Sequence, residues 1–294
     1  MSETILNYIK DKRPNISKSS LKTYESIIRN LYKKVFDNDE YNLDNFSKDS
    51  EKVINYLKDL PSNKRKTVLS ALVVITDNKD YRELMLDDIK EYNKTEAKQQ
   101  KTDTQKENWV DSETLDKMMK VLFHNAKLLY NKENKNPTDY QEIQNYIILC
   151  LFGGYYIPPR RSLDYVDFKI KNIDKNKDNF INKNSFIFNS YKTAKTYGQQ
   201  VVDIPKELKA ILNKWIKINP TDYLLFDISF KPLSNVKLNQ RLNKLFGKKV
   251  GVNQMRKTYL SEKYSDLIDT KKQMEQDFKD MGSSTLQENI YIKK

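Results

Sequence analysis

The fold of this protein is set by residues 146–168, which read YIILCLFGGYYIPPRRSLDYVDF. In the first twelve of them, 146–157, only two glycines interrupt the apolar and aromatic side chains, and the run is too short to cross a bilayer. Such a run is typical of a buried helix. Pro158 and Pro159 are expected to stop that helix, because proline has no backbone N–H to continue it. Two arginines then open the next segment.

The chain as a whole is basic and polar. It has 294 residues, with 53 Lys and Arg against 40 Asp and Glu, and a formal net charge of +13. This excess makes a polyanion the first partner to consider. The single cysteine, Cys150, cannot form an intrachain disulfide, and its apolar neighbours favour core packing in a reducing compartment. Because residues 1–12 lack the apolar stretch of a signal peptide, we expect a cytoplasmic or nuclear protein that is neither secreted nor bound in a membrane.

Two domains are expected from the length and from a change in composition. Residues 1–93 carry amphipathic stripes at helical spacing, each too short to be stable alone, and predict a compact helical bundle. Residues 94–108 include KTEAKQQKTDTQKE, which has no large apolar residue to bury, and predict an extended, solvated linker. Residues 109–294 are the predicted second domain.

One region of the second domain breaks the helical pattern. Residues 185–190 and 199–204 are short runs with aromatic and β-branched side chains, separated by YKTAKTYG, and predict a β-hairpin. The predicted fold class is therefore mainly α with a small antiparallel sheet (α+β). Helices are expected after the hairpin at residues 206–217, 235–246, 252–264 and 270–281.

Three stretches far apart in the sequence place cationic or nucleophilic groups beside structure-breaking signals. The first is PPRRSLDY at residues 158–165, and the second is the predicted hairpin turn, YKTAKTYG, at 191–198. The third is NQMRKTYLSEKY at 253–264, followed by MGSSTLQENIY at 281–291. Each has an ordinary explanation when taken alone, since an arginine pair can begin a solvated helix and an exposed turn often carries lysine. Their combination is more informative.

Together these stretches resemble the sequence boxes of the tyrosine recombinase (phage-integrase-like) superfamily, and PPRRSLDY is similar to forms in integrase-like proteins of large DNA viruses and virophages. The likeness covers the second domain, and the helical first domain resembles the family's core-binding domain. The family's R-x-x-E/D-L motif fits Arg161, with Asp164 three residues on, better than Arg160, which stays the alternative. Its K-T-x-K hairpin motif matches KTAK at 192–195 and implies Lys192 as a proton donor.

The C-terminal boxes match the family in part. The family's H-x-x-R-H-T box reads NQMRKT here, which keeps Arg256 and replaces a histidine by Asn253. Its L-G-H-S box reads MGSS, which replaces another histidine by Ser283, and Tyr291 follows eight residues later as the implied nucleophile. Asn and Ser can donate hydrogen bonds but cannot take up a proton as imidazole does, so a loss of roughly 10²-fold in rate is expected. Each can also be an ordinary helix cap.

The resemblance implies a specific chemistry. The guanidiniums of Arg161 and Arg256 would clamp a phosphate while the phenol of Tyr291 attacks it and forms a covalent 3′-phosphotyrosine bond. Lys192 would protonate the leaving 5′-oxygen. The energy of the phosphodiester bond is kept, so no ATP, cofactor or metal is expected. Further contacts to DNA are expected from Arg160, Lys195 and Lys257.

The protein that this resemblance implies is a site-specific recombinase or integrase of a viral or mobile element. It would bind double-stranded DNA, act on it as a homo-tetramer, and be a monomer or dimer when free. Two alternatives stay open. A type IB topoisomerase-like enzyme would share the chemistry but relax DNA without a partner site. A DNA-binding protein of recombinase descent would have lost catalysis together with the two histidines.

Overall fold

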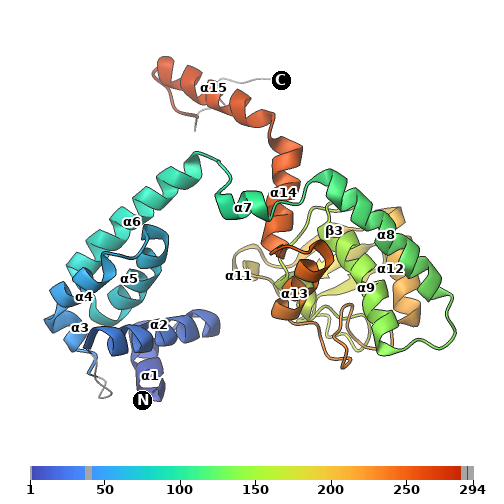
Figure 1. The fold of residues 1–294 in the computed structure, drawn as a ribbon, viewed down its shortest axis with the longest axis horizontal. Helices are drawn as coiled ribbons and strands as arrows, with labels where there is room; N and C mark the ends of the chain where they lie inside the picture. Colours follow the sequence, from blue (N-terminus) through green and yellow to red (C-terminus); the bar gives the residue numbers. More distant parts are fainter. Residues whose placement is uncertain (1, 37–41, 286–289, 291–294) are drawn as a thin grey trace. The chain divides into compact units, whose positions relative to one another are not determined.

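A computed structural model describes residues 2–36, 42–285 and 290 of the chain. The chain divides into two compact units, Met1–Gln100 and Lys101–Lys294, each with its own buried core. Both are built mainly of helices, and the strands of the described residues form one three-stranded antiparallel sheet in the second unit (Figure 1). This confirms the predicted fold class. No helix in the described ranges is long and apolar enough to span a membrane.

The first unit is a helical bundle, in which each helix turns one apolar stripe inward. Tyr32 and Tyr81 are fully buried in its core. The hydroxyl of Tyr81 donates a hydrogen bond of 2.6 Å to the backbone oxygen of Phe46, so that its polar end is satisfied. The helices are α1 (Ser2–Lys12), α2 (Lys18–Phe36), α3 (Asn45–Lys48), α4 (Ser50–Leu57), α5 (Ser62–Thr76) and α6 (Lys79–Ala97).

Helices also occupy part of the segment that was expected to be an extended linker. α6 continues to Ala97, and α7 (Asp103–Glu107) follows after a short break. Thr102 and Gln105 form a capping box at the start of α7, in which each side chain accepts a hydrogen bond from the other residue's backbone N–H. The expectation was wrong for these residues, because a cap satisfies the free N–H groups of a short helix without burial of any apolar side chain. The unit boundary after Gln100 falls inside this segment, and the predicted domain limits stay predictions.

The second unit is built around α9 (Pro137–Phe152), which contains most of the apolar stretch. All residues from 146 to 152 are buried. The two prolines were expected to stop this helix, but it already ends at Gly153. Gly154 has a φ of +81°, which favours glycine, and a Cβ there would lie 2.5 Å from the ring of Tyr259. The helix therefore ends where the chain must pass close to a neighbouring aromatic side chain.

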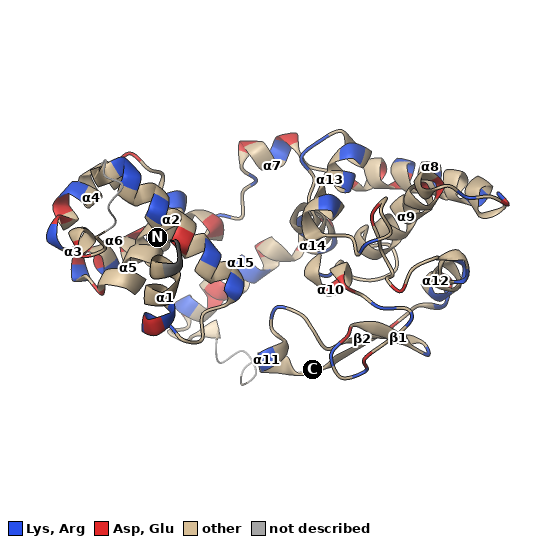
Figure 2. Ribbon diagram, turned by 90° about the horizontal axis from the view of Figure 1, so that it is seen from below, with Lys and Arg blue, Asp and Glu red and all other residues tan. Residues whose placement is uncertain are grey.

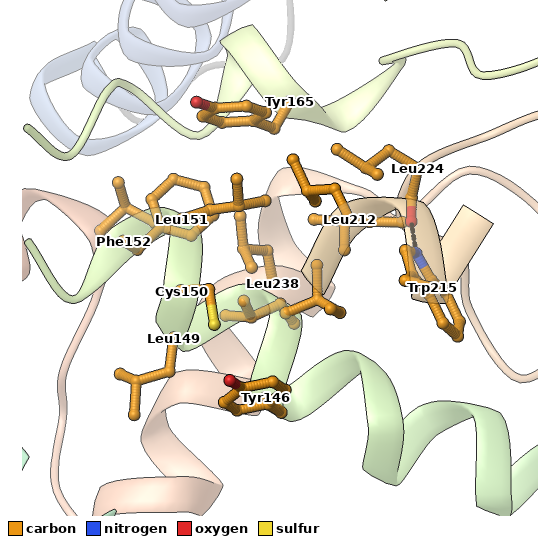
Figure 3. Close-up of a cluster of buried hydrophobic side chains, with 14 of the residues drawn as sticks. Tyr146, Leu149, Cys150, Leu151, Phe152, Tyr165, Leu212, Trp215, Leu224 and Leu238 are labelled. Atoms are coloured by element: carbon orange, nitrogen blue, oxygen red, sulfur yellow. Dashed lines mark hydrogen bonds between the residues drawn. The ribbon is translucent and has the colours of Figure 1, made fainter. Parts of the chain in front are cut away.

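Four more helices enclose α9. They are α8 (Ser112–Tyr130), α12 (Lys206–Ile218), α13 (Asn235–Phe246) and α14 (Val252–Tyr264). Trp215 is fully buried, and its ring N–H donates a hydrogen bond of 2.8 Å to the backbone oxygen of Leu224 (Figure 3). Cys150 is buried among apolar side chains, and burial raises the pKa of its thiol to about 12. The last helix, α15 (Leu267–Asp280), extends from the end of α14 away from α9 and the sheet (Figure 1).

The sheet has the order β1 (Phe180–Asn182), β2 (Ser185–Phe188) and β3 (Gln200–Asp203), with antiparallel neighbours. The β2–β3 pair aligns Phe186 with Val202 and confirms the predicted hairpin. β1 was not predicted, because three residues are too few to show a strand pattern. Two short helices lie near the strands in sequence: α10 (Leu163–Val166) precedes β1, and α11 (Ala194–Tyr197) lies between β2 and β3, where it replaces part of the expected turn.

Candidate active site

Arg160 is held by protein groups on several sides. Its Nε donates a hydrogen bond of 2.7 Å to Oδ2 of Asp164, and its Nη2 donates one of 2.9 Å to Oε1 of Gln200 on β3. The guanidinium also lies over two aromatic rings, 4.0 Å from the centre of Phe188 and 5.5 Å from that of Tyr191. These contacts attach the α10 turn to the sheet.

Arg161 and Arg256 lie near the same carboxylate but are not bound to it. Asp164 is 2% exposed, and burial raises the pKa of its carboxyl, while the charges of Arg160, Arg161 and Arg256 partly offset that rise. Among the described residues, no hydrogen bond or ion pair joins the side chain of Arg161 or Arg256 to another group. Both side chains are partly exposed. Two guanidiniums from distant parts of the chain therefore lie close enough to one buried carboxyl to act on its pKa, and their side-chain donors are not bound by other described residues.

The start of α14 carries three of the predicted residues. Asn253 and Lys257 are exposed, and Asn253 precedes Arg256 by three positions, which places both on one face of the helix. The ordinary explanation of Asn253 as a helix cap does not hold, because the cap position is Gly251. The free N–H of Val252 is bound instead by Oδ1 of Asn239 on α13, at 3.0 Å. The side chain of Asn253 is thus not used in capping its own helix.

Lys192 and Lys195 are exposed on the connection between β2 and β3. The base of this connection is bound by Asn179, which is 5% exposed. The Asn179 side chain donates to the backbone oxygens of Asp164 (2.9 Å) and Ser190 (2.7 Å), and its oxygen accepts two backbone N–H groups, from residues 189 and 190. The loop that carries the two lysines is therefore tied to the same turn that carries Asp164.

The structure does not bring Ser283 to this cluster. Ser283 follows α15, and its backbone N–H donates a hydrogen bond of 2.8 Å to Phe278, which closes the C-terminal end of that helix. α15 extends away from α10 in Figure 2, and away from α9 and β3 in Figure 1. The proposed nucleophile, Tyr291, lies outside the described residues. The roles of all these residues stay predictions.

Sequence reasoning missed the residues that hold the cluster together. Gln200, Asn179 and Asn239 are polar residues without any spacing signal, and their importance depends on which distant segment they meet. Only Asp164 was marked in the sequence, as part of the R-x-x-D motif. The positive charge is also not confined to the cluster, since Lys and Arg are spread over the helices of both units with acidic residues between them (Figure 2).

Comparison with known proteins adds little. No family model matches the chain, and no curated protein matches it. Among solved structures, the chain is similar to the crystal structure of XerA recombinase, with 12% sequence identity over 89% of this chain and 82% of that chain, and a TM-score of 0.34. A similarity of this size does not establish a shared fold or a shared activity.

Proposed function

We propose that the protein is a site-specific DNA recombinase or integrase of the tyrosine recombinase type. The observation that supports this proposal is the pair of guanidiniums, Arg161 and Arg256, whose charges both act on the buried Asp164 and whose side chains have no hydrogen-bonding partner among the described residues. Arginine forks of this kind bind phosphate oxygens through two parallel hydrogen bonds and are charged at every working pH. Arg160 is occupied by protein contacts, which favours Arg161 as the phosphate ligand.

The proposed reaction joins the phenol oxygen of Tyr291 to a backbone phosphorus and breaks the bond to the 5′-oxygen. Lys192 gives a proton to that oxygen, and the phenol loses its own proton to solvent. The two arginines balance the negative charge that grows on the phosphoryl oxygens in the transition state. Rejoining is the same reaction in reverse with a new 5′-hydroxyl, so the energy of the bond is kept and neither ATP nor a metal is needed.

Two further residues of the site have weaker support. Asn253 shares a helix face with Arg256 and can donate a hydrogen bond to a phosphate oxygen. Ser283 would have to reach the phosphate through a movement of α15 or from a second copy of the chain. The duplex itself is held by the general positive charge, to which Lys195 and Lys257 contribute as exposed cations.

A nicked suicide duplex tests the proposal, because the strand beyond the nick diffuses away and traps the covalent intermediate. Wild-type protein should give a slowly migrating protein–DNA adduct on a denaturing gel, and Tyr291→Phe should give none. Tyr264→Phe, which changes an exposed tyrosine on α14, is the matched control and should retain the adduct. If the wild type forms no adduct, the protein is a DNA-binding protein of recombinase descent that has lost catalysis. Relaxation of plasmids that lack any recombination site, by monomeric protein, would indicate a type IB topoisomerase-like enzyme.

A further inference from the structure

A chain of hydrogen bonds connects the segment of Arg161 to the helix that carries Arg256. Ser162 directly follows Arg161, and its hydroxyl donates to Oδ1 of Asn235 at 2.5 Å. The same oxygen accepts from Nδ2 of Asn239, at 3.3 Å, one turn further along α13. Oδ1 of Asn239 then accepts the backbone N–H of Val252, at 3.0 Å. This series of hydrogen bonds ends at Val252, one helical turn before Arg256.

The last of these contacts acts as a helix cap provided by another helix. The first N–H groups of a helix have no partner within it, and a side chain at the cap position normally accepts one of them. α14 begins after Gly251, which has no side chain to do so. Asn239 reaches across from α13 and fills the role. The position at which α14 begins is therefore set by α13 and not by its own sequence.

Gly251 makes this contact possible. A Cβ at this position would lie 2.9 Å from Oδ1 of Asn239 and 3.5 Å from its Cγ, and apart from the adjacent residues no other heavy atom of the described residues lies within 4 Å of it. The backbone there is extended, with φ −102° and ψ 172°, so that an alanine would fit the backbone itself. The effect of the alanine Cβ would be to push the side-chain amide of Asn239 away from the N–H of Val252.

We propose that Asn235 and Asn239 are positioning residues that fix Arg256 relative to Arg161, through Ser162 on one side and Val252 on the other. This inference rests on the proposed function for its consequence, since two guanidiniums that share one phosphate must be placed to within a fraction of an ångström. A displacement of about 1 Å in such a site costs roughly 10²-fold in rate. Neither asparagine touches the phosphate.

The hydrogen-bond network can be tested without an activity assay, by measuring hydrogen exchange in peptides that contain Val252. Asn239→Ala and Gly251→Ala should each raise the exchange rate at the start of α14 by about tenfold, because both remove the cap from that N–H. Ser162→Ala should raise it as well, from the far end of the chain of hydrogen bonds. Asn243→Ala is the matched control, since Asn243 lies one turn beyond Asn239 on the same helix and its side chain makes no hydrogen bond within the described residues.

The consequence for catalysis is tested by the rate of adduct formation on the nicked duplex. Asn239→Ala should lower that rate by roughly 10- to 10²-fold and leave the duplex dissociation constant within about twofold of wild type. A merely structural role would lower the rate and raise the dissociation constant together. Combining Asn239→Ala with Gly251→Ala should cost no more than Asn239→Ala alone, because the added Cβ then meets nothing.

The outcomes separate the two claims. Exchange in Ser162→Ala that equals wild type, or an adduct rate in Asn239→Ala that equals Asn243→Ala, would overturn the positioning role. If the wild type forms no adduct, the proposed function fails, and the exchange rates still decide whether the network sets the start of α14.

Discussion

Nε of Arg160 lies 2.7 Å from Oδ2 of Asp164, four residues further along the chain. This pair separates the roles of two adjacent arginines. Arg160 is bound to the carboxylate, to Gln200 and to two aromatic rings, whereas Arg161 has no such partner among the described residues. The charges of Arg160, Arg161 and Arg256 in turn all act on the pKa of this carboxyl.

Arg160→Met should destabilise the second unit by about 3 kcal/mol, because it leaves the buried carboxyl of Asp164 without its hydrogen-bonded partner. Burial already raises the pKa of Asp164, and loss of Arg160 raises it further. The folded state then holds a proton that the unfolded state releases, so the variant's stability should fall as the pH rises above about 4. Urea unfolding between pH 5 and 8 measures this. Arg82→Met, which breaks an exposed ion pair with Asp77, should cost less than about 1 kcal/mol; an equal cost would contradict the prediction.

Arg256→Ala should lower the rate of adduct formation by roughly 10²- to 10³-fold, because the transition state loses one of the two groups that balance its charge. Binding to an uncut duplex should change little, since one phosphate contact among many carries a small share of the affinity. Gel shift and suicide-duplex assays on the same preparation measure both. Loss of duplex binding together with the adduct would show that Arg256 supports the fold and not the reaction.

Affinity for duplex DNA should fall steeply with salt. Release of counterions from the DNA predicts a loss of about 10³-fold between roughly 50 and 200 mM salt for a protein that neutralises several phosphates. The formal net charge of +13 is large enough to neutralise several phosphates. Fluorescence anisotropy at a series of salt concentrations gives the slope. A flat response would argue against binding through the phosphate backbone.

Asn179→Ala should loosen the base of the loop that carries Lys192 and Lys195. A buried carbonyl oxygen at Asp164, a part-buried one at Ser190 and two part-buried backbone N–H groups lose their partner, which should cost about 2 kcal/mol. Trypsin should then cleave after these two lysines faster than in the wild type. Asn213→Ala, at an exposed position of α12, is the control and should leave the cleavage rate unchanged. Unchanged cleavage in Asn179→Ala would show that the loop is held by other contacts.

Asp139 should contribute stability that is lost in acid. Hydrogen bonds from Nζ of Lys132 (2.6 Å) and from the backbone N–H of Asn136 (2.7 Å) hold the pKa of its carboxyl below the ordinary value. Its contribution is therefore present above about pH 4 and lost as the pH falls through the lowered pKa. Asp139→Asn should cost about 1 kcal/mol at pH 7 and clearly less at pH 3.

Unfolding curves at both pH values measure the difference. Asp87→Asn, in an exposed pair with Lys90, is the control and should change stability little at either pH. A cost for Asp139→Asn that stays the same at pH 3 would show that the amide disturbs the cap by its shape and not by its charge.

Much of the fold could be predicted because it depends on neighbours in the sequence. The apolar run at 146–152 is buried, and the β2–β3 hairpin forms where aromatic and β-branched residues alternate with turn residues. The two elements that were not predicted, α7 and β1, also have local causes. The helix at Asp103–Glu107 forms through a capping box that needs no apolar residue, and β1 is too short to leave a pattern.

The sequence by itself determined which chemical groups the protein possesses: the basic charge, the paired arginines, and a helix with Arg256 three residues after Asn253. Only the tertiary structure decided which of them meet. The motif favoured Arg161 but left Arg160 as the alternative, and the structure shows that Arg160 is bound to the sheet whereas the side chain of Arg161 has no partner among the described residues. The start of α14 likewise depends on Asn239, thirteen positions away. Such contacts arise from the packing of whole helices and strands, and the type of a residue does not specify which distant residue it will contact.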